Sequence, residues 1–255
     1  MTRLKTLSEI NKMKQAGKIL AACHQEIKKR IQPGISTLEI DAFAEQFLLD
    51  HGATPEQKGY RGRVMDYPYA TCASINEMVC HGFPSKEPLK EGDIVTIDMV
   101  VNLDGWLADS AWSYAVGKVS EQADNLLKDT KESLYIGIEQ AKIGNRIGDI
   151  SHAIQVFGES KGYGVVREFS GHGIGKHIHE APDVPHFGKA GFGPRIKEGM
   201  VFTIEPMLNL GTAHCYVEDD GWQAKTFDGK WSAQYEHTIA ITKDGPMILT
   251  DQDHL

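Results

Sequence analysis

The sequence predicts an α+β domain built from two related halves. Its main support is a repeat: residues 90–98 recur as residues 197–205, at an offset of 107 with five of nine positions identical. Patterns typical of helices, then strands, then helices, then strands follow one another, which favours α+β over a strict βαβ winding. With 41% apolar and 24% charged residues, the 255-residue chain has an ordinary globular composition.

The first two elements are expected to be helices. Residues 7–31 carry apolar side chains at helical spacing, and a Pro-Gly pair at 33–34 ends the pattern. Ser36 followed by Glu39 forms a capping-box pattern, which predicts a second helix that ends near Gly52.

Strands follow in the first half. Residues 53–68 have the punctuation of a loop, and residues 69–75 have the pattern of a strand. Residues 94–101 and 106–116 are predicted to form a hairpin, with residues 102–105 as the turn between them.

The second half repeats this order. Residues 121–143 and 146–161 are predicted to be helices, and the strands are expected at 165–168, 201–207, 214–217 and 236–242. No linker interrupts the series, so we expect one domain over residues 1–255 with two internally related halves.

Composition excludes several classes of protein. A net charge of −8 offers no basic surplus to replace phosphate counterions, which argues against DNA binding. No run reaches the length of a membrane span, and the N-terminus lacks a signal-peptide pattern. Four cysteines without a CxxC pair indicate free thiols in a reducing compartment, so a cytoplasmic protein is expected.

The predicted hairpin carries a pair of acids. Asp98 and Asp109 are equally far from the centre of the predicted turn, so their β-carbons should lie opposite, about 4.5–5.5 Å apart. Two like charges at that position destabilise a hairpin. A divalent metal ion would compensate them. For this pair alone, the competing interpretation is that one acid faces solvent or pairs with a lysine.

Three further residues favour the metal. His172 lies in a glycine-rich turn, Glu205 ends a strand before Pro206, and Glu236 precedes an apolar strand. Four carboxylates and one histidine form a hard, oxygen-rich ligand set that suits two divalent ions with bridging carboxylates. A paired-metal site of this kind predicts hydrolysis.

Two other histidines fit such a site. His81 follows a strand, and His179 lies seven residues after His172; either could donate to a substrate amide or to an oxyanion. A single histidine of this kind is more often structural, and that interpretation is kept for His177, His186 and His214.

These motifs resemble those of type I methionine aminopeptidases in the pita-bread metallopeptidase superfamily. The resemblance covers nearly the whole chain, and it implies the pita-bread fold and removal of the initiator methionine from nascent proteins. The motifs that carry it are Ser-Ile-Asn-Glu-x-Val-Cys-His81-Gly, Asp98 with Asp109, Gly-His172-Gly-Ile-Gly, Thr-Ile-Glu205-Pro and Ser-Ala-Gln-Tyr-Glu236-His-Thr.

The resemblance also implies a role for each ligand. Asp98 and Asp109 would bind a first metal, with Asp109 bridging. His172 and Glu205 would complete the second, and Glu236 would bridge both. The metals expected are Co, Mn, Fe or Zn, and Glu205 would also handle the proton of the attacking water.

Further residues match the substrate side of the family's site. His81 would contact the amide nitrogen of the scissile bond, and His179 the carbonyl side of the intermediate. The methionine pocket would be lined by Tyr60, Cys72 and Trp222. A monovalent cation is implied near Asn76 and Ser232.

The chain departs from the family pattern near the pocket. Residues 63–66 have the form of an insertion before Tyr67-Pro68, Gln57 replaces a pocket cysteine, and Ile178 stands where an aromatic residue is usual. These changes predict preserved aminopeptidase activity with an altered tolerance at the second residue of the substrate.

The expected partner is the N-terminal methionine of nascent polypeptides. The resemblance allows a transient contact with the ribosome, and a monomer without DNA or membrane partners is expected. The nearest alternative is a peptidase of the same fold that acts on Xaa-Pro bonds, although those usually carry an extra N-terminal domain. A binding module that has lost its metals, or an acidic structural domain, would explain the ligand set less well.

Overall fold

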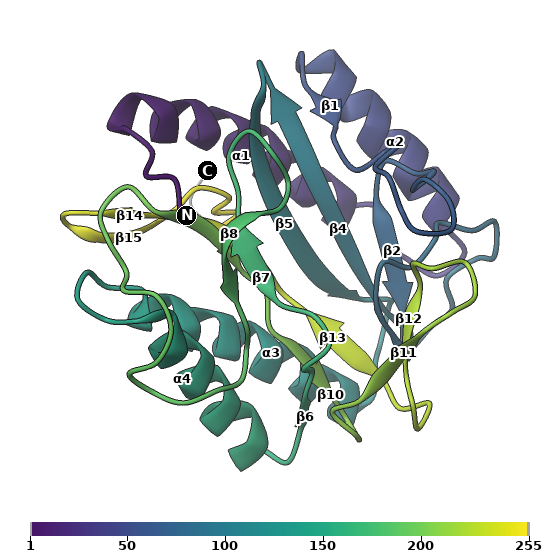
Figure 1. Ribbon diagram of the computed structural model, residues 1–255. Coiled ribbons are helices and arrows are strands. Elements are labelled where there is room, and N and C mark those ends of the chain that lie inside the picture. The colour runs from purple at the N-terminus through teal and green to yellow at the C-terminus, as the bar shows by residue number, and fades with distance from the viewer. Residues whose placement is uncertain (1, 254–255) are drawn as a thin grey trace.

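A long hairpin organises the first half of the computed structural model, which describes residues 2–253 (Figure 1). Its strands are β4 (Ile94–Leu103) and β5 (Trp106–Ala115). The short strands β1 (Thr54–Pro55) and β2 (Cys72–Ile75) also pair with β4, all in antiparallel fashion. Strand β4 therefore forms the middle of the first sheet, with β5 along one of its edges.

Two helices cover this sheet. They are α1 (Leu7–Lys28) and α2 (Thr37–Asp50), and α1 packs on both β4 and β5. The capping box of Ser36 and Glu39 is confirmed, and Thr6 with Glu9 forms a second one at the start of α1. Each box satisfies backbone N–H groups that the first helical turn leaves without partners.

The second half repeats the use of two helices and antiparallel strands. Helices α3 (Glu121–Gln140) and α4 (Ile147–Ser160) pack together, and Figure 1 shows α3 beside β10 and β13. Within the described chain, a five-stranded sheet has the order β15-β14-β9-β7-β8. Its members are β7 (Gly171–Gly173), β8 (Glu180–Val184), β9 (Val201–Ile204), β14 (His237–Thr242) and β15 (Gly245–Ile248).

Two small sheets complete the fold, and one of them joins the halves. Strands β13, β10 and β6 form one, and β11, β12 and β3 form the other. Their bounds are β3 (Met78–Cys80), β6 (Gly164–Val165), β10 (Met207–Asn209), β11 (Cys215–Val217), β12 (Ala224–Thr226) and β13 (Ser232–Gln234). Because β3 pairs with β12, a strand of the first half is joined to one near the C-terminus.

The repeated segments fold alike. Strands β4 and β9 begin at equivalent positions of the repeat, Ile94 and Val201. Gly34 and Gly144 both have φ of +99°. Gly34 donates its N–H to the Leu89 carbonyl oxygen, shortly before β4, and Gly144 donates its N–H to the Ile196 carbonyl oxygen, shortly before β9. Two isolated bridges also correspond between the halves: Ser36 pairs with Pro88 in the first half, and Arg146 pairs with Arg195 in the second.

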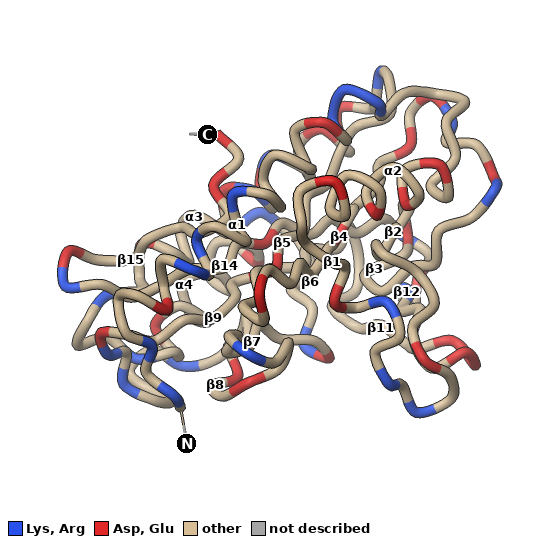
Figure 2. Tube along the Cα trace, turned by 90° about the horizontal axis from the view of Figure 1, so that it is seen from above, with Lys and Arg blue, Asp and Glu red and all other residues tan. Residues whose placement is uncertain are grey.

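The main core lies between the helices and the sheets. Leu20, Leu48, Ile97, Leu134 and Phe202 are fully buried members of it, drawn from both halves. Lys and Arg positions are interspersed with Asp and Glu around the outside of the molecule (Figure 2). Among the helices of residues 2–253, none combines the length and apolar character needed to cross a bilayer.

Several predicted boundaries were wrong. The turn is the two-residue pair Asp104-Gly105, with φ of +53° and +74°, and not the four residues 102–105. The strand expected at 165–168 is only Gly164–Val165. The strand expected at 201–207 is split into β9 and β10, because Pro206 has no N–H to continue the ladder.

Candidate metal centre and adjoining pocket

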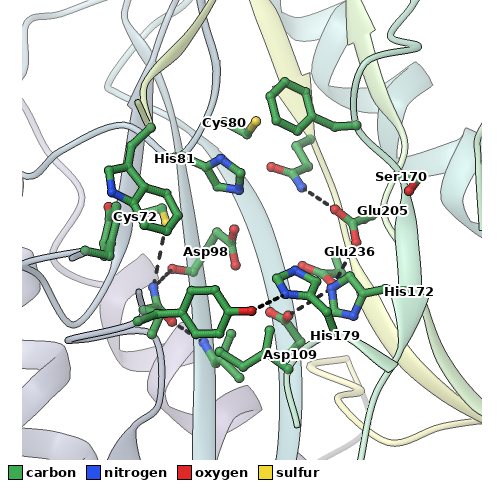
Figure 3. A pocket seen from close by; sticks show the side chains of 18 of the residues that line it. Cys72, Cys80, His81, Asp98, Asp109, Ser170, His172, His179, Glu205 and Glu236 are labelled. Atoms are coloured by element: carbon green, nitrogen blue, oxygen red, sulfur yellow. Dashed lines mark hydrogen bonds and ion pairs between the residues drawn. The ribbon is translucent and has the colours of Figure 1, made fainter. Parts of the chain in front are cut away.

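The side chains of the five predicted ligands line one cavity. Strands that are far apart in the sequence bring them there (Figure 3). Asp98 comes from β4 and Asp109 from β5, while His172 lies on β7, and Glu205 and Glu236 adjoin the ends of β9 and β14. Both halves of the chain therefore contribute predicted ligands.

The two hairpin acids lie diagonally and not opposite. Asp98 pairs with Ala111, and Asp109 pairs with Val100, because the turn is centred one residue later than predicted. The shift preserves the face of the sheet, so both side chains still point into the cavity. Burial raises the pKa of Asp109, and the Asp98 carboxyl lies close enough to raise it further.

A tight cluster forms around Asp109. Asp109, His172 and Glu236 each offer one ligand atom, and these atoms lie within 4.8 Å of one another. Glu205 joins them, since its Oε1 is 3.6 Å from His172 Nε2. All four side chains are buried.

The hydrogen bonds of His172 define which nitrogen is available. Its Nδ1 lies 3.1 Å from the Gly173 carbonyl oxygen, which can only accept, so Nδ1 carries the proton. Nε2 then presents a lone pair, 3.6 Å from Asp109 Oδ2. Burial lowers the pKa of His172 to about 4, so the ring is neutral at pH 7 and suited to bind a metal.

Glu205 is held by two side chains that the sequence analysis did not select. The Thr203 hydroxyl donates to Glu205 Oε1 at 2.8 Å, and Gln234 Nε2 donates to Oε2 at 3.3 Å. Thr203 also accepts from the His172 backbone N–H at 2.9 Å. The sequence did contain a signal for these two partners. Thr203 lies two residues before Glu205, and Gln234 lies two residues before Glu236, so in an extended chain each shares a face with an acid.

The four buried acids of the centre hold their protons more tightly than ordinary carboxyl groups. Burial raises the pKa of Asp98 to about 7 and that of Glu205 to about 8. Burial, reinforced by the neighbouring acids, raises the pKa values of Asp109 and Glu236 well above the ordinary range. Asp109 Oδ1 and Glu236 Oε1 are buried without a hydrogen-bond partner in the described part of the chain. These oxygens and the His172 nitrogen are the donors that divalent ions prefer, so the residues fit a metal centre.

His81 and His179 lie on opposite sides of the cavity mouth. His81 has a left-handed φ of +56°, an uncommon backbone for a histidine, and its ring meets Phe169 and Trp222 edge-on. Burial, and then the neighbouring His179, lowers the pKa of His81 to about 4. His179 Nδ1 lies 2.9 Å from the Tyr60 hydroxyl. Neutral imidazoles at both positions can donate hydrogen bonds to a ligand.

The rest of the cavity wall is largely apolar. The predicted residues Tyr60, Cys72 and Trp222 are part of it. The wall also contains residues that the sequence did not single out, because apolar and aromatic residues resemble ordinary core residues in a sequence. They are Tyr67, Cys80, Val100, Phe169 and Met207. All four cysteines of the chain are free, buried thiols.

Asn76 and Ser232 lie together but away from the cavity. The Ser232 N–H donates to the Asn76 carbonyl oxygen at 2.8 Å. The Asn76 amide is bonded to Asp93 and to the Ile94 N–H. Among residues 2–253, the buried Ser232 hydroxyl has no hydrogen-bond partner. The same holds for Oδ1 of Asn209, the residue that pairs with Ser232 on the neighbouring strand β10.

Residues 63–66, which the sequence predicts to be an insertion, pack beside the cavity. Trp222 Nε1 donates to the Met65 carbonyl oxygen at 2.8 Å, which fixes the indole that lines the wall. Tyr67, just after the insertion, is buried and its hydroxyl bonds the Gly82 carbonyl oxygen at 3.0 Å. Gln57 and Ile178 both line the cavity. The departures from the family pattern therefore surround the pocket.

The remaining histidines differ in setting. His214 forms a solvent-exposed pair with Glu168 at 3.1 Å. His186 is fully buried and accepts from the Glu205 backbone N–H at 3.1 Å, directly beneath the centre.

Comparison with known proteins gives a consistent result. Metallopeptidase family M24 matches residues 11–243. A methionine aminopeptidase of Clostridium perfringens is 48% identical over 250 residues, which is 98% of this chain and 99% of that protein. Methionine aminopeptidase 1 of Bacillus subtilis is 48% identical over 246 residues, covering 96% and 98%.

A solved structure agrees in fold over the same length. The crystal structure of methionine aminopeptidase from Rickettsia prowazekii superimposes with a TM-score of 0.95 at 40% identity. The match covers 98% of this chain and 100% of that one.

Proposed function

The chain belongs to metallopeptidase family M24, and on that premise we propose that the cavity described above is its active site. The protein is a metal-dependent methionyl aminopeptidase with the pita-bread fold, and it removes the N-terminal methionine from nascent proteins and peptides. The observation that carries the assignment of the site is the convergence of four buried acids and one neutral histidine on a single cavity.

The enzyme uses divalent metal, and we propose that it holds two ions. Asp98 and Asp109 would bind the first, His172 and Glu205 the second, with Asp109 and Glu236 between them. Such a pair supplies a nucleophile from water at neutral pH and polarises the substrate carbonyl. Co, Mn, Fe and Zn all suit these ligands, and availability selects among them.

The remaining residues would bind and orient the peptide. His81 would donate to the amide nitrogen of the scissile bond, and His179 to the carbonyl side of the intermediate. Glu205 would take the proton of the attacking water. Tyr60, Cys72 and Trp222 would enclose the methionine side chain.

Four finer points belong to the same proposal. The orphaned Ser232 hydroxyl beside Asn76 supports a monovalent cation there. Four free thiols support a cytoplasmic setting. A monomeric state and a transient contact with the ribosome complete the expected setting.

The reaction can be tested with the peptide Met-Gly-Met. Purified protein is stripped of metal and then supplied with Mn or Co, and the products are identified by mass spectrometry. We expect loss of one methionine, and only one, in the presence of metal. An Ala-Pro peptide and an N-acetylated Met-Gly-Met serve as controls. Cleavage of the Ala-Pro peptide in preference to Met-Gly-Met would instead favour an Xaa-Pro peptidase.

The substitutions around the pocket lead us to propose an altered tolerance at the second residue. The insertion at 63–66 fixes Trp222, which lines the pocket. Rates on a panel of Met-Xaa peptides should therefore change when residues 63–66 are deleted. The same profile in the deletion variant and the natural chain would contradict this proposal.

A further inference from the structure

One edge of strand β4 has a gap beside a proposed metal ligand. β5 pairs with β4 along its whole length, from Ile94 to Leu103. β1 and β2 must therefore share the other edge. β2 pairs with residues 95–98 and β1 with residues 101–102, so neither strand reaches Met99 and Val100.

The side chain of Gln57 fills this gap. Its Oε1 accepts from the Val100 N–H, and its Nε2 donates to the Asp98 carbonyl oxygen at 3.0 Å. The next residue along the chain from β1, Glu56, donates its backbone N–H to the Val100 carbonyl oxygen at 2.9 Å. One side-chain amide thus takes the place of a peptide group in a missing stretch of strand.

The surroundings leave no easy substitute for this amide. Gln57 is only 7% exposed, and its Nε2 also lies 3.8 Å from Cys72 Sγ. Without the amide, the Val100 N–H and the Asp98 carbonyl oxygen would lose these partners in a buried setting, where unpaired polar groups are costly. The two groups flank Met99 on either side, so they control the backbone from which the Asp98 side chain projects.

We propose that Gln57 is a positioning residue, which joins β1 to β2 across the gap in β4 and thereby fixes the Asp98 carboxylate in the metal centre. This inference rests on the proposed function, because it takes Asp98 to be a metal ligand. Residues that orient metal ligands in this indirect way commonly change metal affinity when they are replaced. The role belongs to the amide of Gln57 and not to its volume.

The test replaces the amide and keeps the volume. Metal-free Gln57→Met is titrated with Mn²⁺ by calorimetry, beside the natural chain. Gln46→Met makes the same chemical change at an exposed position of α2 and serves as the matched control. We expect the affinity of the tightest Mn²⁺ site to fall about tenfold or more in Gln57→Met and to stay unchanged in the control.

A second measurement needs no metal. Hydrogen exchange of the Val100 amide in the metal-free protein should become faster in Gln57→Met, whereas the amides that β2 pairs should stay protected. At saturating Mn²⁺, kcat on Met-Gly-Met should fall more than KM changes. If Gln57 contributed to stability alone, Gln57→Met would have a lower melting temperature, but its Mn²⁺ affinity, kcat and KM would equal those of the natural chain.

The outcomes separate this inference from the proposed function. Failure of the natural chain to bind Mn²⁺ or to cleave Met-Gly-Met would overturn the proposed function. Normal binding by the natural chain, with Gln57→Met within twofold of it and Val100 equally protected, would overturn the role of Gln57. If Gln57→Met does not fold, Gln57→Asn keeps an amide too short to reach both groups, and the same loss of affinity is expected; natural affinity in that variant would contradict the proposal.

Discussion

Asp109 occupies the position where negative charge is hardest to accommodate. It is buried beside Asp98 and Glu205, and one of its oxygens lacks a partner among the residues described. Isolated buried charges destabilise proteins, so a carboxyl group in such a place indicates a role in binding and not in folding.

Asp109→Asn should therefore separate stability from activity. We expect the metal-free variant to be more stable than the natural chain by about 1–2 kcal/mol at pH 7, because it removes repulsion and a costly ionisation. Cleavage of Met-Gly-Met should be abolished. Urea unfolding of the chelated proteins and a peptide assay would measure the two effects, with the exposed Asp244→Asn as control. A metal-free variant that is less stable than the natural chain would contradict the charge argument.

His24 should give the fold a pH dependence away from the metal centre. It is fully buried, bonded to Tyr114 and to the Ser110 carbonyl oxygen, and burial lowers its pKa from 6.5 to about 4. The unfolded chain therefore takes up the proton first as the pH falls. Stability from this group is complete above pH 6.5 and is lost as the pH falls toward 4.

His24→Gln should remove that part of the pH dependence. Between pH 7 and pH 5 the natural chain should lose about 2 kcal/mol more stability than the variant. Urea unfolding at the two pH values gives the difference directly. His186, which is also buried and not coupled electrostatically to His24, affects both proteins equally and cancels. Equal slopes would show that His24 is not neutral in the fold.

The placement of single residues was the most predictable level. Each residue selected for the divalent metals or the substrate lines the cavity, whereas Asn76 and Ser232, selected for a monovalent cation, do not. Thr203 and Gln234 carried only the signal of lying two residues before an acid, and Gln57 carried no comparable signal. Their hydrogen bonds depend on which strands meet, and a lone threonine or glutamine does not reveal that.

At the scale of elements, the β4–β5 hairpin shows what a sequence leaves undecided. The run Asn102-Leu103-Asp104-Gly105 permits a turn at more than one centre. The Asn102 side chain accepts from the Gly105 N–H at 2.8 Å, and the type I′ pair Asp104-Gly105 matches the twist of the strands. The pairing moved by two residues, yet the acids kept their face, because the side-chain period of a strand is two.

Strand β7 depends on a close approach that only glycine permits. A Cβ at Gly171 would lie 2.5 Å from the Thr203 carbonyl oxygen, and the Thr203 hydroxyl bonds both His172 and Glu205. Gly171→Ala should cost about 1–3 kcal/mol by forcing the strands apart. The Mn²⁺ affinity should fall with it. Urea unfolding and calorimetric titration would measure both, and natural values for both would contradict the importance of this contact.

At the scale of the whole molecule, we propose that residues 1–255 form one domain with two internally related halves. The equivalent starts of β4 and β9, the paired glycine turns and the paired bridges support it. The first half supplies Asp98 and Asp109, and the second supplies the other three proposed ligands. The order of elements could be foreseen from the repeat. The short strands that join the halves could not, because runs of two or three residues carry too little pattern.

Metal should therefore stabilise the whole fold. At a free Mn²⁺ concentration one hundred times its dissociation constant, binding adds about 2.7 kcal/mol. For a chain of this size that raises the melting temperature by about 5–10 °C relative to the chelated protein. Calorimetry with and without chelator would measure the shift, and Asp109→Asn should lose most of it. A melting temperature that is the same with and without metal would contradict the expectation that the ions bind within the folded core.

The most direct test of the account is anomalous X-ray scattering from crystals soaked with Mn²⁺. The account predicts two neighbouring peaks, enclosed by Asp98, Asp109, His172, Glu205 and Glu236. Strong peaks elsewhere, or none among these five side chains at a concentration that supports peptide cleavage, would contradict it.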